Sequence, residues 1–150
     1  MTARLTIDAN VLVYALDARH PLKQGGALKV IDACRDKDCA IALQVFSEHY
    51  AALTRKLRRA PWEAAQAVRN IMLQFPHFQA TSSAVDRALS EAAAGRYGYW
   101  DALLLAAAHD AGRAVCFSED MQDGAVLGAV EVVNPLGPNG LSARAMALLS

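Results

Sequence analysis

The stretch Arg4-Leu-Thr-Ile-Asp-Ala-Asn-Val-Leu-Val-Tyr-Ala15 carries the pattern that decides the fold. Arg4 to Ile7 is a short and mostly apolar run, which predicts a buried β-strand. Asp8-Ala-Asn10 follows, and the chain then turns into a helix that we expect from Val11 to about Leu16. A short buried strand that passes directly into a helix is typical of the units that build parallel sheets.

The same alternation of short apolar runs and helical segments continues along the chain. Further strands are predicted at Cys39–Leu43, Phe78–Ala80, Ala114–Phe117 and Val130–Val133. Further helices are predicted from Leu22 to about Asp36, from Val45 to Arg59, from Pro61 to shortly before Pro76, from Ser82 or Ser83 to Gly95, and from Trp100 to Ala111. We therefore expect a three-layer α/β/α fold with a mainly parallel central sheet. The two helices between residues 45 and 73 should form an inserted helical hairpin, and residues 134–140 a loop.

The bulk composition narrows the class of protein. A chain of 150 residues is most simply one domain, which we expect to span residues 1–150 with a core at about 4–135 and a tail at 136–150 that ends in a short helix. Its 54% hydrophobic and 20% charged residues exclude disorder as the default. The formal net charge is +0, so any contact with nucleic acid must depend on a local basic patch or on bound metal.

The chain shows no sequence sign of export or membrane insertion. The amino terminus lacks a long apolar region, so we expect no signal peptide. The longest purely apolar run, Ala102 to Ala108, is too short to cross a bilayer. Three cysteines without metal spacing are best interpreted as reduced thiols, which predicts a cytoplasmic protein. The four histidines also lack ligand spacing and are interpreted as surface or packing residues.

Four acidic residues stand at the ends of predicted strands or in the helices that follow them: Asp8, Glu48, Asp101 and Asp120. In an open parallel sheet, ligands bind beyond the carboxyl ends of the strands, so these side chains can meet there. Gathered carboxylates repel one another, and a hard cation such as Mg²⁺ or Mn²⁺ relieves that repulsion. Taken singly, each acid is equally well explained as a cap, a turn residue or a solvated helix residue. Asp123 is an alternative to Asp120, although a surface turn role suits it better.

Four motifs, taken in order, resemble those of the PIN domain family. They are Thr6-Ile-Asp-Ala-Asn-Val-Leu-Val-Tyr-Ala15, Gln44-Val-Phe-Ser-Glu48, Tyr99-Trp-Asp-Ala-Leu103 and Ser118-Glu-Asp-Met-Gln-Asp-Gly124. Asn134-Pro135 resembles a common ending of the family, although Leu136 stands where an aromatic residue is frequent. The resemblance covers about residues 4–135 and is strongest to the VapC-type toxins of toxin–antitoxin pairs.

This resemblance implies an endoribonuclease that depends on Mg²⁺ or Mn²⁺ and acts as the toxin of a VapBC-type pair. It implies that Asp8, Glu48, Asp101 and Asp120 are the catalytic and metal-binding quartet. Bound metal would supply the chemistry of phosphodiester hydrolysis. Asn10 and Ser118 are expected to support the site by orienting a carboxylate and by holding a water or a phosphate oxygen. The implied partners are an RNA substrate, a small VapB-type antitoxin and a second copy of the chain in a homodimer.

Two groups of residues are candidates for RNA contact. Arg55 and Arg59 belong to the only dense basic cluster, and both fall within about 20° of the helical azimuth of Glu48. They can guide an RNA backbone, or they can simply complement the dipole of a solvated helix end. The aromatic residues at 97, 99 and 100 can stack on bases, but burial beside the third motif is the favoured interpretation.

Three other functions compete with a toxin. A housekeeping PIN-type RNA-processing nuclease would use the same residues. A haloacid-dehalogenase-type phosphatase would need a second aspartate where Asn10 stands and a downstream lysine, and no lysine follows Lys56. A non-catalytic metal-binding module would need a closed cage of ligands, which carboxylates at an open sheet edge do not favour.

Overall fold

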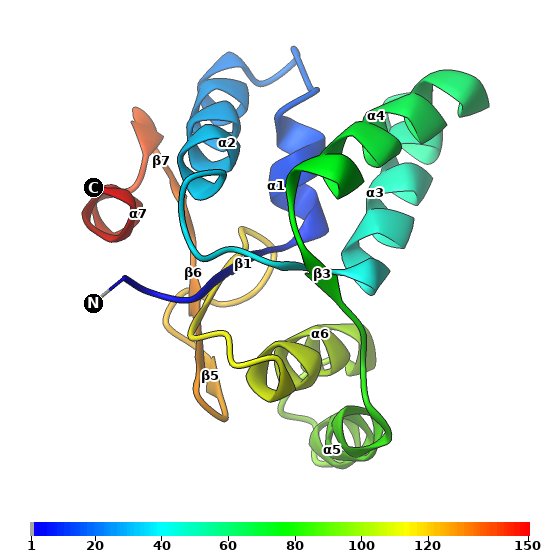
Figure 1. Ribbon diagram of the computed structural model, residues 1–150, viewed down its shortest axis with the longest axis vertical. Coiled ribbons are helices and arrows are strands. Elements are labelled where there is room, and N and C mark those ends of the chain that lie inside the picture. Colours follow the sequence, from blue (N-terminus) through cyan, green and yellow to red (C-terminus); the bar gives the residue numbers. More distant parts are fainter. Residues whose placement is uncertain (1) are drawn as a thin grey trace.

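The computed structural model describes residues 2–150 (Figure 1). The helices, in chain order, are α1 (Ala9–Tyr14), α2 (Pro21–Cys34), α3 (Leu43–Arg55), α4 (Pro61–Gln74), α5 (Ser82–Ala93), α6 (Tyr99–Asp110) and α7 (Ala143–Leu149). The strands are β1 (Leu5–Ile7), β2 (Ile41–Ala42), β3 (His77–Phe78), β4 (Val115–Phe117), β5 (Val126–Leu127), β6 (Val130–Val133), β7 (Leu136–Gly137) and β8 (Gly140–Leu141).

The central sheet is mainly parallel, as predicted. Its order is β1-β4-β6-β5, with β1, β4 and β6 parallel and β5 antiparallel to β6. A two-stranded parallel sheet of β2 and β3 adjoins β1, because Leu5 forms a parallel bridge with Cys39. Strand β1 is therefore central, with β2 and β3 on one side of it and β4 and β6 on the other. The switch in strand order lies between β1 and β4, where ligand sites form in open parallel sheets.

Helices cover both faces of this sheet (Figure 1). Helices α1 to α4 lie on one side of the strands and α5 and α6 on the other, which gives the expected α/β/α layers. Helices α3 and α4 pack on each other and form the expected helical hairpin. Pro61 opens α4, where a proline costs no helical hydrogen bond.

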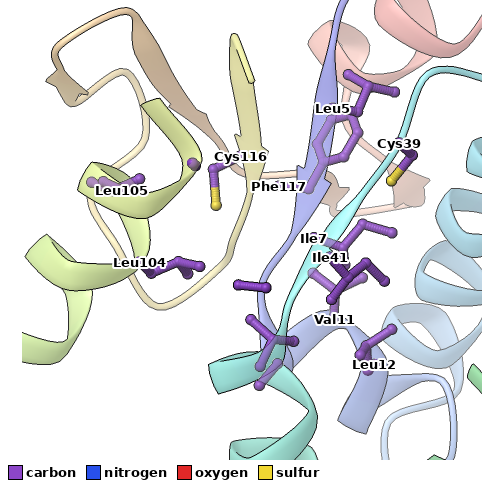
Figure 2. Close-up of a cluster of buried hydrophobic side chains, with 14 of the residues drawn as sticks. Leu5, Ile7, Val11, Leu12, Cys39, Ile41, Leu104, Leu105, Cys116 and Phe117 are labelled. Atoms are coloured by element: carbon purple, nitrogen blue, oxygen red, sulfur yellow. The ribbon is translucent and has the colours of Figure 1, made fainter. Parts of the chain in front are cut away.

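The core follows from the alternation of side chains along the short strands. Figure 2 shows Cys116 of β4 on the same side as Leu104 and Leu105 of α6, whereas Leu5 and Phe117 lie on the opposite side. All five side chains are buried. Successive residues of a strand point to opposite faces, so each three-residue strand contributes to both layers. The three cysteines are free and buried, as expected for structural thiols.

Several local expectations were wrong. The predicted loop at 134–140 contains the antiparallel pair β7–β8, and the two-residue strand β5 was not foreseen. The predicted strand at Cys39–Leu43 is shorter, because Leu43 already begins α3. Ser82 and Ser83, which the sequence suggested as caps of the helix ending near Gly95, lie inside α5, and Thr81 caps it by accepting a hydrogen bond from the Ala84 amide. No helix among residues 2–150 is long and apolar enough to cross a membrane.

One glycine has a packing role that its helical position does not suggest. Gly26 lies inside α2, where glycine usually weakens a helix. A Cβ atom at this position would approach the Gly140 carbonyl oxygen to 2.9 Å. The glycine therefore allows α2 to lie directly against the β7–β8 pair.

Candidate active site

Asp8 is the buried centre of the candidate site. It follows β1 directly and caps α1, since its Oδ1 accepts a 2.7 Å hydrogen bond from the Ala9 amide. Its Oδ2 accepts from the Asn10 side-chain amide at 3.0 Å and from the Ser118 hydroxyl at 2.8 Å. A carboxylate offers about four acceptor positions, so three are engaged by the protein and one on Oδ1 remains.

Asn10 and Ser118 are the support that the sequence predicted. The Asn10 amide group also donates to the Ser118 hydroxyl oxygen at 3.1 Å, and its carbonyl oxygen accepts from the Glu119 backbone amide at 2.9 Å. These bonds join the turn after β1 to the turn after β4. The network fixes the orientation of the Asp8 carboxylate.

Glu48 is on the exposed face of α3 and reaches the same edge of the sheet. Its Oε1 accepts a 2.7 Å hydrogen bond from the Gln44 side-chain amide one helical turn earlier. The same Gln44 nitrogen donates to the Trp100 carbonyl oxygen at 3.1 Å. Gln44 therefore links α3 to the first turn of α6, which carries Asp101.

The four carboxylates act on one another electrostatically. Burial raises the pKa of Asp8 from 3.8 to about 6, the hydrogen bonds from Ser118 and Ala9 oppose this, and the charges of Glu48 and Asp101 raise the pKa further. Asp101 is solvent-accessible, yet partial desolvation and the charge of Asp120 raise its pKa as well. Asp8 is therefore within electrostatic range of Glu48 and Asp101, and Asp101 within range of Asp120, because a nearby like charge disfavours ionisation.

The donor set suits a hard divalent cation. All four side chains offer carboxylate oxygens, and three of them are exposed to solvent. Among residues 2–150, no three His, Cys, Asp or Glu side chains lie close enough together to form a metal cage. Mg²⁺ is commonly held by one or two carboxylates, with water and substrate oxygens completing its shell. Carboxylates at an open edge of the sheet are therefore more compatible with such a partly hydrated Mg²⁺ than with a closed structural metal site.

A cavity of about 390 Å³ beside the carboxylates is lined by cationic side chains. Glu48 and Asp120 line it together with Arg55 and Lys56. Arg59, the other predicted RNA contact, instead donates to the Leu16 carbonyl oxygen at 3.0 Å. Sequence spacing placed both arginines on the Glu48 face of a helix predicted to reach Arg59, but α3 ends at Arg55 and the left-handed backbone at Arg58 redirects the chain before position 59.

A second polar cavity lies on the other side of Asp120. It has a volume of about 540 Å³ and is lined by Asp101, Asp120, Arg87 and Arg96 among others. Arg96 is paired with Glu91 at 2.6 Å. Asp120 therefore lies between two cavities that each contain basic side chains.

Neighbouring acids have structural roles that distinguish them from the quartet. Glu119 accepts hydrogen bonds from the Tyr14 hydroxyl at 2.8 Å and from Lys23 at 3.0 Å. Asp123, the alternative to Asp120, accepts a 2.8 Å hydrogen bond from the Asn134 amide. Sequence reasoning missed the group around Glu119, because Lys23 is far away in the chain and only the fold brings it close.

His49 is a packing residue with an unusual environment. It is 1% exposed on α3, and neither ring nitrogen has a hydrogen-bond partner among the described residues. Burial lowers the pKa of His49 from 6.5 to about 4. The imidazole is thus neutral at physiological pH.

Three solved structures resemble this arrangement of helices and strands. Mycobacterium tuberculosis VapC20, a sarcin-ricin loop cleaving toxin, aligns with a TM-score of 0.59 at 19% identity, over 77% of this chain and 89% of that chain. A toxin–antitoxin complex from Klebsiella pneumoniae aligns with a TM-score of 0.62 at 17% identity, over 84% of this chain and 94% of that chain. PAE2754 from Pyrobaculum aerophilum aligns with a TM-score of 0.57 at 21% identity, over 80% and 82%.

The chain has the fold of a VapC-like PIN domain. No protein-family profile and no curated protein matches the sequence, so the likeness rests on structure. In this VapC-like fold, the first and fourth motifs meet where β1 and β4 end, through the hydrogen bond between Ser118 and Asp8. The second and third motifs meet through Gln44 and the Trp100 carbonyl.

Proposed function

We propose that this protein is an Mg²⁺- or Mn²⁺-dependent endoribonuclease and the toxin of a VapBC-type toxin–antitoxin pair. The observation that carries the proposal is the buried Asp8 at the switch point of a VapC-like fold, where the charges of Glu48 and Asp101 act on it and the charge of Asp120 acts on Asp101. VapC20 is itself described as a sarcin-ricin loop cleaving toxin, which supports RNA as the substrate class.

The four carboxylates would hold the divalent cation, with Asp8 and Asp101 as the main ligands. Asp8 is oriented by Ser118 and Asn10 and retains one acceptor position on Oδ1. Glu48 is oriented by Gln44 and acts directly or through water. A bound cation of this kind lowers the pKa of water and stabilises negative charge on phosphate oxygens.

The basic side chains beside the quartet would position the RNA backbone. Arg55 and Lys56 line the cavity that Glu48 and Asp120 also line. Phosphate contacts of this kind fix the register of a strand without reading its sequence. They also offset the repulsion between the RNA phosphates and the acidic residues. The whole chain has a net charge of +0, so it exerts no overall attraction on RNA that would offset this repulsion.

The catalytic proposal is tested with Asp101→Asn. This change removes one charge but keeps the shape of the side chain, so RNA cleavage should be lost while the circular dichroism spectrum is retained. Chelator should abolish cleavage by the parent protein, and added Mg²⁺ or Mn²⁺ should restore it. Full activity in excess chelator would exclude the proposed chemistry.

The toxin role needs a separate test, because a housekeeping nuclease of the same fold would pass the first one. A toxin–antitoxin complex is among the structures that resemble this chain, which supports a small protein partner. We expect that expression of this protein alone arrests growth, that Asp8→Asn does not, and that a small neighbouring gene product co-purifies with a homodimer and restores growth. Harmless accumulation of active, metal-dependent ribonuclease would favour the housekeeping function instead.

A further inference from the structure

Trp100 is exposed at the edge of an apolar recess next to the candidate active site. The sequence favoured burial of this side chain, but 64% of its surface is exposed. The recess has a volume of about 520 Å³, and Trp100 and Leu103 of α6 face Glu48 and Ala51 of α3 across it. Exposure alone does not mark a binding site, since Trp62 is also exposed, but Trp100 differs in lining a recess that Glu48 also lines.

Trp100 has an aromatic contact and a backbone hydrogen bond to neighbouring groups. Tyr99 contacts the Trp100 ring edge-to-face, with 5.1 Å between the ring centres. The Trp100 carbonyl accepts the 3.1 Å hydrogen bond from Gln44, whose amide also binds Glu48 at 2.7 Å. The backbone of Trp100 and the proposed metal ligand Glu48 are therefore connected through the Gln44 side chain.

The recess also contains polar groups suited to a planar heterocycle. Gln44 and Gln79 line it. The Gln44 amide nitrogen already donates to Glu48 and to the Trp100 carbonyl, so Gln44 offers its carbonyl oxygen as an acceptor, whereas the Gln79 amide offers both a donor and an acceptor. Unpaired bases of RNA are bound by stacking on aromatic side chains and by hydrogen bonds to their edges. An apolar recess with one aromatic wall and two amides fits this chemistry.

We propose that the Trp100 recess is a nucleobase subsite, in which a base of single-stranded RNA stacks on the indole beside the cleaved bond. This inference rests on the proposed ribonuclease function and adds a substrate-reading residue to it. Glu48 lines both the recess and the cavity that contains Arg55 and Lys56. A strand with its phosphates in the cationic cavity can thus place a neighbouring base in the recess.

RNA suits the recess better than an apolar segment of a protein partner does. A leucine or phenylalanine inserted here would lie against the Glu48 carboxylate and would leave the Gln44 carbonyl oxygen and the Gln79 amide without partners, which is unfavourable. The amino and carbonyl groups of a base edge can satisfy both. The subsite therefore predicts a preference among bases, and Trp100 supplies the stacking part of the affinity.

The test measures binding separately from cleavage. In an Asp101→Asn background with Mg²⁺, short oligo-A, oligo-C and oligo-U are compared with an abasic ribose-phosphate oligomer of the same length. At least one base-bearing oligomer should bind about 5- to 100-fold more tightly than the abasic one. The chain has two tryptophans, so Trp62→Phe leaves Trp100 as the only indole, and its fluorescence should be quenched by that oligomer.

Matched variants identify the residue responsible. Trp100→Ala should abolish most of the preference over the abasic oligomer, and Trp100→Phe should retain part of it because a ring remains. Trp62→Ala, at an exposed tryptophan on α4, should change nothing. Thermal melting checks that each variant is folded.

The outcomes separate the subsite from the ribonuclease proposal. If the parent protein cleaves no RNA but shows a base preference that depends on Trp100, the subsite proposal stands and the ribonuclease proposal is wrong. Metal-dependent cleavage with an unchanged preference in folded Trp100→Ala would overturn the subsite alone. An unchanged preference together with loss of a co-expressed small partner from Trp100→Ala would assign the recess to protein docking, and would also overturn it.

Discussion

Ser118 donates its hydroxyl hydrogen to Oδ2 of Asp8 across 2.8 Å, although 110 positions separate the two residues in the chain. The bond is buried and joins the ends of the adjacent parallel strands β1 and β4. It opposes the effect of burial by lowering the pKa of Asp8. One serine thus both connects two motifs and keeps the central carboxylate closer to its ionised form.

The first prediction concerns this bond. Ser118→Ala should lower the free energy of unfolding by about 1–3 kcal/mol, because a buried hydrogen bond to a charged group is lost. It should also reduce RNA cleavage, since Asp8 is then oriented by fewer partners. Urea unfolding and cleavage assays measure both effects, with exposed Ser90→Ala on α5 as the matched control. Unchanged stability of Ser118→Ala would show that the bond contributes little.

The second prediction separates two nearby aspartates. Asp120→Asn should reduce metal-dependent cleavage about 10-fold or more, because its charge acts on Asp101 and its side chain lies between the two polar cavities. Asp123→Asn should retain activity, since an asparagine oxygen can still accept the hydrogen bond from Asn134. Equal loss of cleavage activity in Asp120→Asn and Asp123→Asn would contradict the assignment of Asp120 as a metal ligand and Asp123 as a turn residue.

The third prediction concerns repulsion within the quartet. The pKa of Asp8 is raised from 3.8 to about 6, so its ionised form destabilises the folded protein at pH 7. Asp8→Asn removes that charge and should be at least as stable as the parent protein in chelator, and should gain less from added Mg²⁺. The advantage should shrink as pH falls below 6 and disappear near pH 3, below both pKa values, where Asp8 is largely protonated in the folded and unfolded states. If Asp8→Asn melts well below the parent protein at pH 7, the main role of Asp8 is to stabilise the fold by accepting hydrogen bonds.

The fourth prediction uses the buried histidine. The folded-state pKa of His49 is lowered to about 4, so between pH 6.5 and 4 only the unfolded chain binds the proton. Stability is therefore full above pH 6.5 and decreases as pH falls, by up to about 1.4 kcal/mol per pH unit.

The test of this prediction compares His49→Leu with the parent protein by urea unfolding at pH 7 and pH 5. The variant should lose less stability between these two pH values. Asp8 titrates in part of the same window with the opposite sign and is present in both proteins, so it cancels in the comparison. Identical losses in the two proteins would show that His49 does not carry the effect.

Much of the fold was predictable because it depends on local patterns. The apolar runs before Asp8 and Asp120 are strands, and the helical segments from Pro61 and Ser82 begin where the sequence indicates. The position of the acids at strand ends was also readable, since it follows from the order of apolar and acidic residues. The two-residue strands β5, β7 and β8 were not predictable, because so short an element has no periodicity to detect.

The sequence by itself determined which residues the candidate site contains, and the tertiary structure decided how they are used. Asp8, Glu48, Asp101 and Asp120 were identifiable from motif and spacing, because their places relative to strands and helices are encoded locally. Contacts between distant segments decide which acids are paired with other side chains, as Glu119 is with Lys23. The exposure of Trp100 and the diversion of Arg59 to the Leu16 carbonyl depend likewise on how helices pack. Burial and long-range hydrogen bonds are properties of the packed chain, and no local pattern of residues specifies them.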